Sequence, residues 1–169
     1  MPLKFTMFET EMGWMGIAGT KKGICRAILP MPDEASAFSA ITEQKESNFE
    51  SLKSEQNGWF SDVKDMLIGY FKGQNVDFSF PLDLDDYTKF QKDVWEATES
   101  IPYGELRTYG WVASQIGKPK SARAVGNALG ANPIPIIIPC HRVVGSDGSL
   151  HGFSGGLHWK QRLIDLEKK

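Results

Sequence analysis

The chain has 169 residues, of which 41% are hydrophobic, and a net charge of −2. This size allows one domain or two small ones, and the composition is that of a globular protein with a core. No apolar run reaches the length of a membrane span, and residues 1–6 lack the apolar core of a signal peptide. We therefore expect a protein of the cytoplasm, or of the nucleus in a eukaryote, that does not bind membranes.

The two cysteines, Cys25 and Cys140, lie far apart and do not form a disulfide framework, which indicates a reducing compartment. The cysteines and the three histidines show no zinc-type clustering, so no metal is expected. Cys25 falls in a strand pattern and is interpreted as a buried structural thiol. Charge is uneven: residues 1–85 carry −5 and residues 86–169 carry +3. The second half could face a polyanion, although solvated lysines explain the asymmetry equally well.

The first half of the chain predicts a small α/β fold. Three strands are expected, at residues 4–9, 14–18 and 24–29, the last ended by Pro30 and Pro32. Residues 33–55 begin with apolar residues at helical spacing and continue into a polar tail that we expect to be a loop. The spacing of apolar residues predicts a helix over 58–72, stopped by Gly73, before a short strand at 76–80.

The second half predicts a mostly helical domain. Thr108 caps an expected helix over 109–116, and Ser121 caps a second one that runs to about Gly130. Two short helices joined by such a turn form a helix-turn-helix, or simply a structural corner. The predicted fold class is therefore α/β (α+β). Its predicted parts are an N-terminal α/β scaffold domain at 1–80, a linker at 81–86 and a C-terminal domain at 87–169, which opens with a helix at 87–99.

The second of these short helices has mostly small side chains. Only Arg123 and Asn127 could reach base edges in a major groove. The small residues allow close backbone approach, which suits a minor groove. Close packing inside the domain is the alternative. The small residues in question are Ala122, Ala124, Gly126 and Ala131.

Residues 132–144 are expected to form a stiff extended track, because three prolines alternate with isoleucines. The track presents Cys140 and His141. A thiol reacts as its thiolate, and a histidine oriented by a carboxylate can take its proton. Neighbours on a strand point to opposite sides, so a turn at Cys140 or a bridging water is needed. Glu167, at the unfavourable end of its helix, is the candidate carboxylate, although a solvated glutamate is the simpler interpretation.

These residues resemble the motifs of the O6-alkylguanine-DNA alkyltransferases, the methylated-DNA–protein-cysteine methyltransferases. The resemblance covers about residues 86–169 and gives the N-terminal part the role of a variable α/β support. Its motifs occur in the same order as in that family: Tyr103-Gly104-Glu105, Thr108-Tyr109, Ala122 to Gly126, Asn132-Pro133, Pro139 to Val143, Ser154-Gly155-Gly156 and Glu167.

The resemblance implies irreversible transfer of an alkyl group, mainly methyl, from O6 of guanine in duplex DNA to Cys140, once per molecule and without a cofactor. A water would link Cys140 to His141, which Glu167 holds. Asn132 would be a hinge, and Tyr109 would assist at the guanine ring. Arg123 would enter the base stack after minor-groove binding and base flipping. The other implied DNA and substrate contacts are Thr108, Ala122, Ala124, Val143, Phe153, Ser154, Gly155 and Gly156.

Two departures from the family pattern affect the loop beside the pocket. Phe153 stands where the family often has tyrosine, and His151-Gly152 changes the pocket mouth. The expected partner is duplex DNA containing O6-alkylguanine, bound by a monomer, with cooperative binding left open. Three other hypotheses are a lesion-binding protein of the alkyltransferase-like kind, a cysteine hydrolase, and a regulator with a structural cysteine. The first of these lacks the cysteine, and the second needs an oxyanion hole.

Overall fold

A computed structural model describes residues 3–43, 49–51, 58–153 and 155–168. The chain divides into two compact units, Met1–Leu84 and Asp85–Lys169. The division therefore falls within the segment 81–86. Each unit is described by itself below.

The N-terminal unit is built on one four-stranded sheet with the strand order β3-β2-β1-β4. Phe5 lies opposite Ala18, and Phe8 lies opposite Met15. The three strands expected from the sequence are confirmed, and β4 is an addition that runs parallel to β1. The strands are β1 (Leu3–Thr10), β2 (Gly13–Thr20), β3 (Gly23–Met31) and β4 (Phe49–Ser51).

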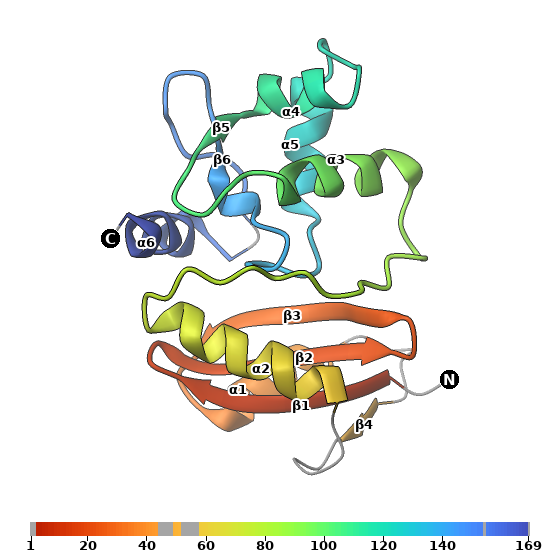
Figure 1. Cartoon of the computed structure of the whole chain (residues 1–169), viewed down its shortest axis with the longest axis vertical. Coiled ribbons are helices and arrows are strands. Elements are labelled where there is room, and N and C mark those ends of the chain that lie inside the picture. Colours follow the sequence, from red (N-terminus) through yellow and green to blue (C-terminus); the bar gives the residue numbers. More distant parts are fainter. Residues whose placement is uncertain (1–2, 44–48, 52–57, 154, 169) are drawn as a thin grey trace. The chain divides into compact units, whose positions relative to one another are not determined.

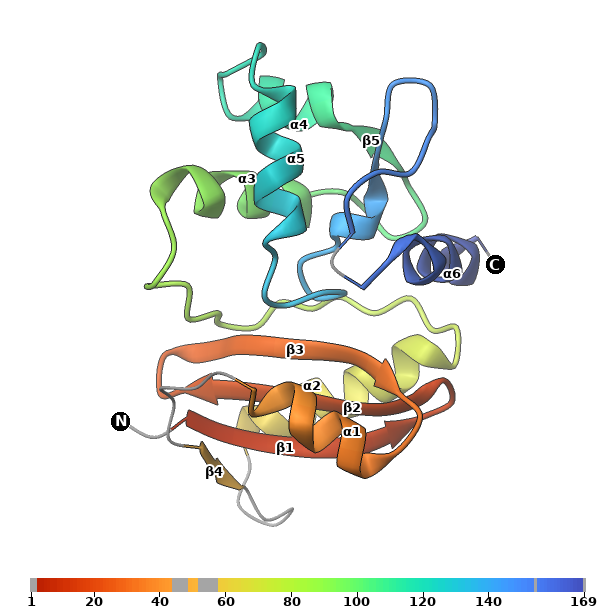
Figure 2. The same ribbon diagram turned by 180° about the vertical axis from the view of Figure 1, so that it is seen from behind.

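Two helices, α1 (Glu34–Ile41) and α2 (Gly58–Phe71), cover opposite faces of this sheet (Figures 1 and 2). The side chain of Asp33 caps α1 by accepting a hydrogen bond from the Ser36 amide at 2.7 Å. Because both faces of the sheet are covered, side chains that point to either face are buried. Buried residues on the two sides include Phe5, Ala18 and Ile41 on the α1 side and Val63 and Leu67 on α2.

Four expectations for this unit are wrong. Strand β3 continues through Pro30, which an edge strand tolerates because its outer side needs no amide donor. Cys25 is half-buried, because it lies on that same edge strand. Residues 49–51 of the expected loop form β4, while residues 44–48 and 52–57 lie outside the described part. Residues 76–80 form no strand; their apolar–polar alternation reflects packing, since the Phe78 ring lies 5.9 Å from that of Tyr70 on α2.

The C-terminal unit packs its helices around a short two-stranded parallel pairing of β5 with β6. The predicted first helix is confirmed as α3, which starts with a capping box between Thr88 and Gln91. Its buried Trp95 donates from Nε1 to the carbonyl of Ala128 on α5 at 2.9 Å. The elements are α3 (Lys89–Glu99), β5 (Arg107–Thr108), α4 (Tyr109–Gln115), α5 (Ala122–Gly130), the 3-10 turn η1 (Cys140–Arg142), β6 (Val143–Val144) and α6 (Leu157–Glu167).

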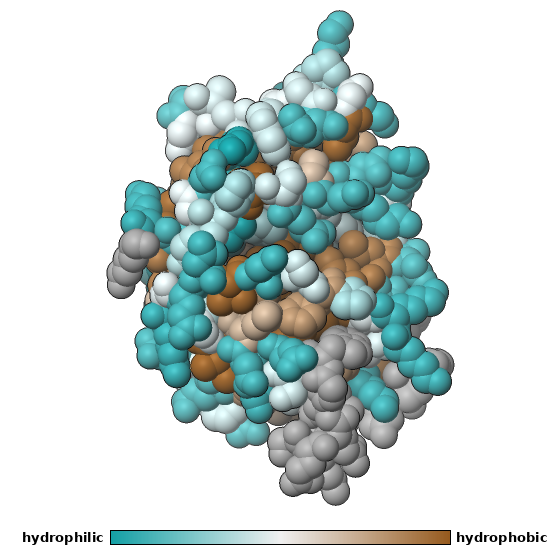
Figure 3. Space-filling model, viewed as in Figure 1, coloured by the Kyte–Doolittle hydropathy of each residue, from teal (hydrophilic) through white to brown (hydrophobic). Residues whose placement is uncertain are grey.

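Helices α4 and α5 form the predicted helix-turn-helix. The hydroxyl of Thr108 accepts the Trp111 amide at 3.0 Å and so caps α4 as expected. Ser121 occupies the cap position of α5, but its side chain makes no capping hydrogen bond. Helix α5 buries one side and exposes Arg123, Ala124 and Asn127. Its small-residue face is therefore partly open: Ala124 and Ala131 are exposed, while Ala122 and Gly126 are half-buried. Figure 3 shows the molecular face seen in Figure 1, where hydrophilic residues surround patches of hydrophobic ones.

The segment 132–144 is not the extended track that its prolines predict. Ile136 has a φ of 76°, and the amide of Ile138 donates back to the carbonyl of Ile134 at 2.9 Å. The side-chain oxygen of Asn132 accepts the Ile134 amide at 2.8 Å, so the chain folds back at once. A left-handed isoleucine is strained, and burial of the surrounding isoleucines offsets that strain. The 3-10 turn that follows begins at Cys140, which is one of the two alternatives that the sequence analysis gave for bringing the thiol and His141 together.

Candidate active site

Cys140 opens the 3-10 turn directly after Pro139, and it is only 3% exposed. The side-chain amide of Asn132 donates to its sulfur at 3.0 Å and to the carbonyl of Ile138 at 2.9 Å. One amide group therefore fixes both the thiol and the turn that carries it. The side-chain oxygen of Asn132 accepts from the Ile134 amide, where the chain folds back before this turn. Both the oxygen and the nitrogen of the Asn132 side chain are therefore hydrogen-bonded.

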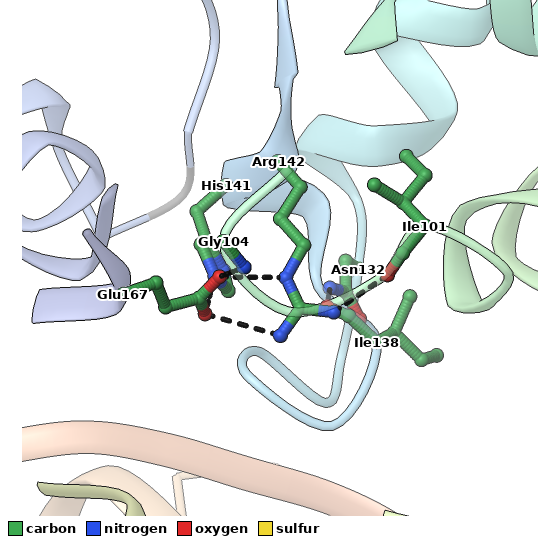
Figure 4. A network of polar contacts seen from close by, with 7 residues as sticks. All are labelled: Ile101, Gly104, Asn132, Ile138, His141, Arg142 and Glu167. Carbon is green, nitrogen blue, oxygen red and sulfur yellow. Dashed lines mark hydrogen bonds and ion pairs between the residues drawn. The ribbon is translucent and has the colours of Figure 1, made fainter. Parts of the chain in front are cut away.

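Glu167, the last residue of α6, accepts hydrogen bonds from three residues in two segments of the chain (Figure 4). Its Oε2 lies 2.6 Å from Nε2 of His141, and its Oε1 lies 2.8 Å from Nε of Arg142. The amide of Gly104 also donates to Oε1, at 3.1 Å. The Nη1 atom of Arg142 donates to the carbonyl of Ile101 at 2.7 Å. The carboxylate is thus a buried and fully engaged anchor for the histidine.

The arrangement determines which His141 nitrogen carries the proton. Arg142 donates to both oxygens of Glu167, which is the geometry of a carboxylate that only accepts, so Nε2 of His141 is the donor to Oε2. Nδ1 then carries the free lone pair, and it is buried without a hydrogen-bond partner among the described residues. Burial lowers the pKa of His141, although Glu167 acts in the opposite direction. A neutral imidazole with its basic nitrogen available is the result.

The thiol needs such a base. Burial raises the pKa of Cys140 to about 11, while the hydrogen bond from Asn132 and the charge of Lys160 lower it in part. Roughly one molecule in ten thousand would hold the thiolate spontaneously at pH 7. Proton transfer to a neighbouring base, coupled to attack on an electrophile, can overcome this scarcity.

Two charged residues of the site were missed by the sequence analysis. Lys160 is 1% exposed, and its ammonium donates to the Tyr109 hydroxyl at 3.2 Å and to the His151 carbonyl at 2.9 Å. Burial lowers its pKa to about 8. Its helical position between Leu157 and Leu163, on an otherwise apolar stripe, was a usable signal. Arg142 stood inside the quoted motif, but nothing in the sequence pairs it with Glu167.

A groove of about 600 Å³ runs along α5 beside Tyr109. Tyr109 and His151 both line it, and the Tyr109 hydroxyl donates to the His151 carbonyl at 3.2 Å. This hydrogen bond joins α4 to the loop on that side of the groove. None of the described residues that line the groove carries a carboxylate. Its lining residues are Tyr109, Ala122, Arg123, Gly126, Asn127, His151 and Gly152.

The other residues singled out by the sequence are spread around this centre. Val143 is buried in β6, and Phe153 is buried beyond the loop. Gly155 and Gly156 are exposed before α6, where Gly156 has a φ of 90° that favours glycine. Ala124 is exposed but is not part of the groove lining. Ser154 lies outside the described residues.

The described residues contain neither a metal-binding cluster nor a membrane-spanning helix. No group of three or more histidine, cysteine, aspartate or glutamate side chains within them could hold a metal ion. In that same part of the chain, no helix has the length and apolarity needed to cross a membrane.

Fold and site together define a class: proteins in which a helix-turn-helix unit carries a buried thiol next to a histidine–carboxylate pair, alongside a small α/β unit. Two family models match the chain. The ribonuclease-like domain of 6-O-methylguanine DNA methyltransferase matches residues 3–84, and the DNA binding domain of the same family matches residues 89–169.

Curated relatives agree. The methylated-DNA–protein-cysteine methyltransferase of Methanosarcina acetivorans is 37% identical over 163 residues, which are 96% of this chain and 97% of the relative. That of Mycobacterium tuberculosis is 53% identical over 111 residues, 66% of this chain and 67% of the relative. The chain therefore belongs to the methylated-DNA–protein-cysteine methyltransferase family.

Solved structures show the same fold. The M. tuberculosis O6-methylguanine methyltransferase superposes with a TM-score of 0.77 at 39% identity, covering 98% of this chain and 93% of that one. M. tuberculosis OGT in complex with DNA gives 0.79 at 37% identity, over 98% and 92%. The O6-methylguanine-DNA methyltransferase of Pyrococcus kodakaraensis gives 0.72 at 26% identity, over 99% of both chains.

Proposed function

We propose that this protein repairs alkylated DNA by moving the alkyl group from O6 of guanine, mainly in O6-methylguanine, to the sulfur of its own Cys140. The observation that carries the proposal is the buried array of Cys140, His141 and Glu167. Its one unused basic atom, Nδ1 of His141, belongs to the residue that follows the thiol. The family membership gives this array its substrate, a methylated base in DNA.

The proton moves first in this scheme. His141 Nδ1 takes the thiol proton through a bridging water, and Glu167 stabilises the imidazolium that forms. Arg142 holds the Glu167 carboxylate in place for this role. The nearby Lys160 ammonium stabilises the thiolate. Burial keeps the thiol protonated until an alkylated base arrives, which limits reaction with other electrophiles.

The sulfur then attacks the alkyl carbon, a carbon–sulfur bond forms, and the bond from that carbon to O6 breaks. The electron pair goes to guanine, which takes a proton and leaves neutral, so that the thiol proton is balanced overall. We assign to Tyr109, which lines the groove, the role of assisting at the guanine ring. Its hydroxyl accepts from Lys160, and burial raises its pKa, so it stays a phenol. The product is a thioether, which no group of the site cleaves, so each molecule reacts once.

Base flipping follows from the burial of the sulfur. Cys140 is 3% exposed, and a base stacked inside a duplex cannot deliver its O6 substituent to it. The partly exposed small-residue face of α5 suits the minor groove, and Arg123 projects from that face to replace the displaced base. Asn132 would act as the hinge between α5 and the turn, since its side chain holds both ends of the segment 134–140.

A cysteine hydrolase needs free amide donors beside the sulfur as an oxyanion hole. The amides of Cys140 and Arg142 donate to Ile138 and Pro139, and that of Val143 donates to Cys140. These three amides are therefore engaged within the turn and are not free to bind an oxyanion.

Titration of a duplex that carries a single O6-methylguanine tests the proposal. Loss of O6-methylguanine, measured by chromatography of the digested DNA, should rise linearly with protein and stop at one lesion per protein molecule. Continued loss beyond that ratio would contradict the single-use reaction, and no loss at any ratio would contradict alkyl transfer. The protein is expected to act as a monomer, which sedimentation on the same duplex checks.

A further inference from the structure

The loop between β6 and α6 contains a chain of polar side chains that alkyl transfer does not use. Asp147 Oδ1 accepts from the Ser149 hydroxyl at 2.5 Å and from the Ser149 amide at 3.0 Å. The Ser149 hydroxyl oxygen in turn lies 2.6 Å from Nε2 of His151. The three side chains fold over Gly145, where a Cβ would come within 2.7 Å of the Ser149 hydroxyl oxygen. Glycine is therefore required there for the chain to close.

The directions of these hydrogen bonds follow from the carboxylate. The two hydrogen bonds from Ser149 lower the pKa of Asp147, so it is an anion that only accepts. The single hydroxyl proton of Ser149 goes to Asp147, and His151 must donate from Nε2 to the Ser149 oxygen. Cδ2 of the same ring faces Gly145, at 3.1 Å from where its Cβ would stand. Nδ1, the ring atom opposite the Nε2–Cδ2 bond, therefore points away from the loop.

A serine, a histidine and an aspartate also suggest a hydrolytic triad, but the order here is wrong. Ser149 lies in the middle, and its proton is directed to the carboxylate instead of to a base. The chain of hydrogen bonds ends on His151, and that residue lines the groove next to Tyr109, with ring centroids 6.2 Å apart. The hydrogen-bonded chain from Asp147 through Ser149 thus orients the exposed imidazole of His151 at the mouth of the proposed DNA groove.

The groove selects an anion. The side chains that line it include the guanidinium of Arg123. The Lys160 ammonium donates a hydrogen bond to the backbone carbonyl of His151. The groups that face His151 are Asp147 on its own loop, Tyr109 on α4, Arg123 on α5 and Lys160 on α6. Asp147 is the one anion among these groups, and its contact with the ring runs through the Ser149 hydroxyl. Histidine side chains generally change charge between about pH 5 and pH 8.

We propose that His151, oriented by Ser149 and Asp147, binds a DNA phosphate beside Arg123 when its imidazole is protonated, so that DNA affinity rises as the pH falls. The inference rests on the proposed function, because it takes DNA as the occupant of the groove. Protonated Nδ1 donates to the phosphate while Nε2 keeps its bond to Ser149. The contact makes the loop a pH-sensitive part of DNA binding, separate from the chemistry at Cys140.

Fluorescence anisotropy with an undamaged duplex and the full chain, at pH 6.0 and 7.5 and fixed salt, tests this inference. Wild-type affinity should rise about threefold to fivefold at the lower pH, the range of one exposed charge contact. His151→Gln should lose that gain, and its slope of log affinity against log salt at pH 6.0 should be smaller by about one. Ser149→Ala should lose part of the gain, because the ring is no longer oriented.

The matched control is His158→Gln, which removes an exposed histidine on α6 and should keep the full gain. Any pH effect from Lys160 is common to wild type and variants and cancels in the comparison. An equal gain in wild type and His151→Gln, or no binding by wild type at either pH, would overturn the inference. Stoichiometric loss of O6-methylguanine by the same proteins is scored separately, so failure of the phosphate contact is distinct from failure of the proposed function.

Discussion

The two units of this protein treat buried polarity in opposite ways. Among the described residues of the N-terminal unit, Thr10 is the one buried polar side chain. The C-terminal unit, of nearly the same length, buries two lysine or arginine cations, an ionised glutamate, a histidine, an asparagine and a threonine. These are Thr98, Asn132, His141, Arg142, Lys160 and Glu167. Five of these six surround Cys140 and the groove.

Buried charges destabilise a fold unless they are paired and hydrogen-bonded. The C-terminal unit carries this destabilising burial of charge around Cys140. Its strained backbone at Ile136, which is left-handed, lies in the turn that leads to the same thiol. The N-terminal unit has a two-sided apolar core, and its described residues form no comparable buried polar cluster. Both units have an apolar core, but the buried polar groups that can do chemistry gather in the C-terminal unit, and each variant below breaks or sharpens that division.

The largest effect is expected from Cys140→Ala, which should abolish methyl transfer and leave DNA binding intact, because it removes the acceptor atom and little volume. Transfer from a labelled duplex and anisotropy on the same DNA measure the two properties. Cys25→Ala in the N-terminal unit is the matched control and should transfer normally. Repair by Cys140→Ala would show that the nucleophile is misassigned.

Glu167→Gln should come next. It leaves the buried Arg142 without its counter-charge, which typically costs about 3–5 kcal/mol of stability. It also weakens the hold on His141, so the rate of transfer should fall by roughly a hundredfold or more. Urea unfolding and single-turnover kinetics measure these losses. The control is Asp165→Asn, an exposed carboxylate on the same helix, and an equal loss there would argue against a special role for Glu167.

Leu67→Ala tests the other side of the comparison. The side chain is fully buried on α2, and its truncation should destabilise the protein by about 2–5 kcal/mol. The transfer rate of the folded protein should not change, because no group of the site is touched. Unfolding curves and kinetics at 20 °C separate the two quantities. A slower reaction by fully folded Leu67→Ala would mean that the N-terminal unit participates in the chemistry.

Arg123→Ala should slow reaction with duplex DNA by about tenfold to a hundredfold, the order of a few kcal/mol expected for an unstacked base. Reaction with free O6-benzylguanine, which needs no base flipping, should change much less. Arg162→Ala, which removes an arginine of α6 that stacks on Trp159, is the control. Equal losses on both substrates would remove the base-flipping role of Arg123.

The smallest effect concerns Lys160, whose pKa is lowered by burial to about 8. In the unfolded chain the pKa of this lysine returns to the ordinary 10.5, so the unfolded state holds the proton over a pH range in which the folded state loses it. The free energy of unfolding should therefore rise by about 1 kcal/mol as the pH increases from 7 to 9. Lys160→Met should show no such rise. Cys140, with its pKa raised from 9.0 to about 11, acts the other way only above pH 9.

Urea midpoints at the two pH values measure this difference, and Lys168→Met, an exposed lysine at the end of α6, should behave like wild type. A rise that persists unchanged in Lys160→Met would mean that another group carries the linkage.

How much the sequence could predict depended on the range of the interactions. Local signals were reliable: Thr108 caps α4, and the spacing of apolar residues located α2. The turn around Ile136 was missed because it is set by Asn132 and by burial of isoleucines, against the preference of the prolines. The ion pair of Arg142 with Glu167 spans 25 residues, and no periodicity indicates such a contact.

The central claim is that Cys140 accepts the alkyl group, and intact mass followed by peptide mapping tests it most directly. After incubation with a duplex that carries one O6-methylguanine, a single added methyl group should appear on the peptide containing Cys140, in a one-to-one ratio to the DNA. A methyl group on another peptide, or no change in mass while DNA binding is retained, would contradict the account.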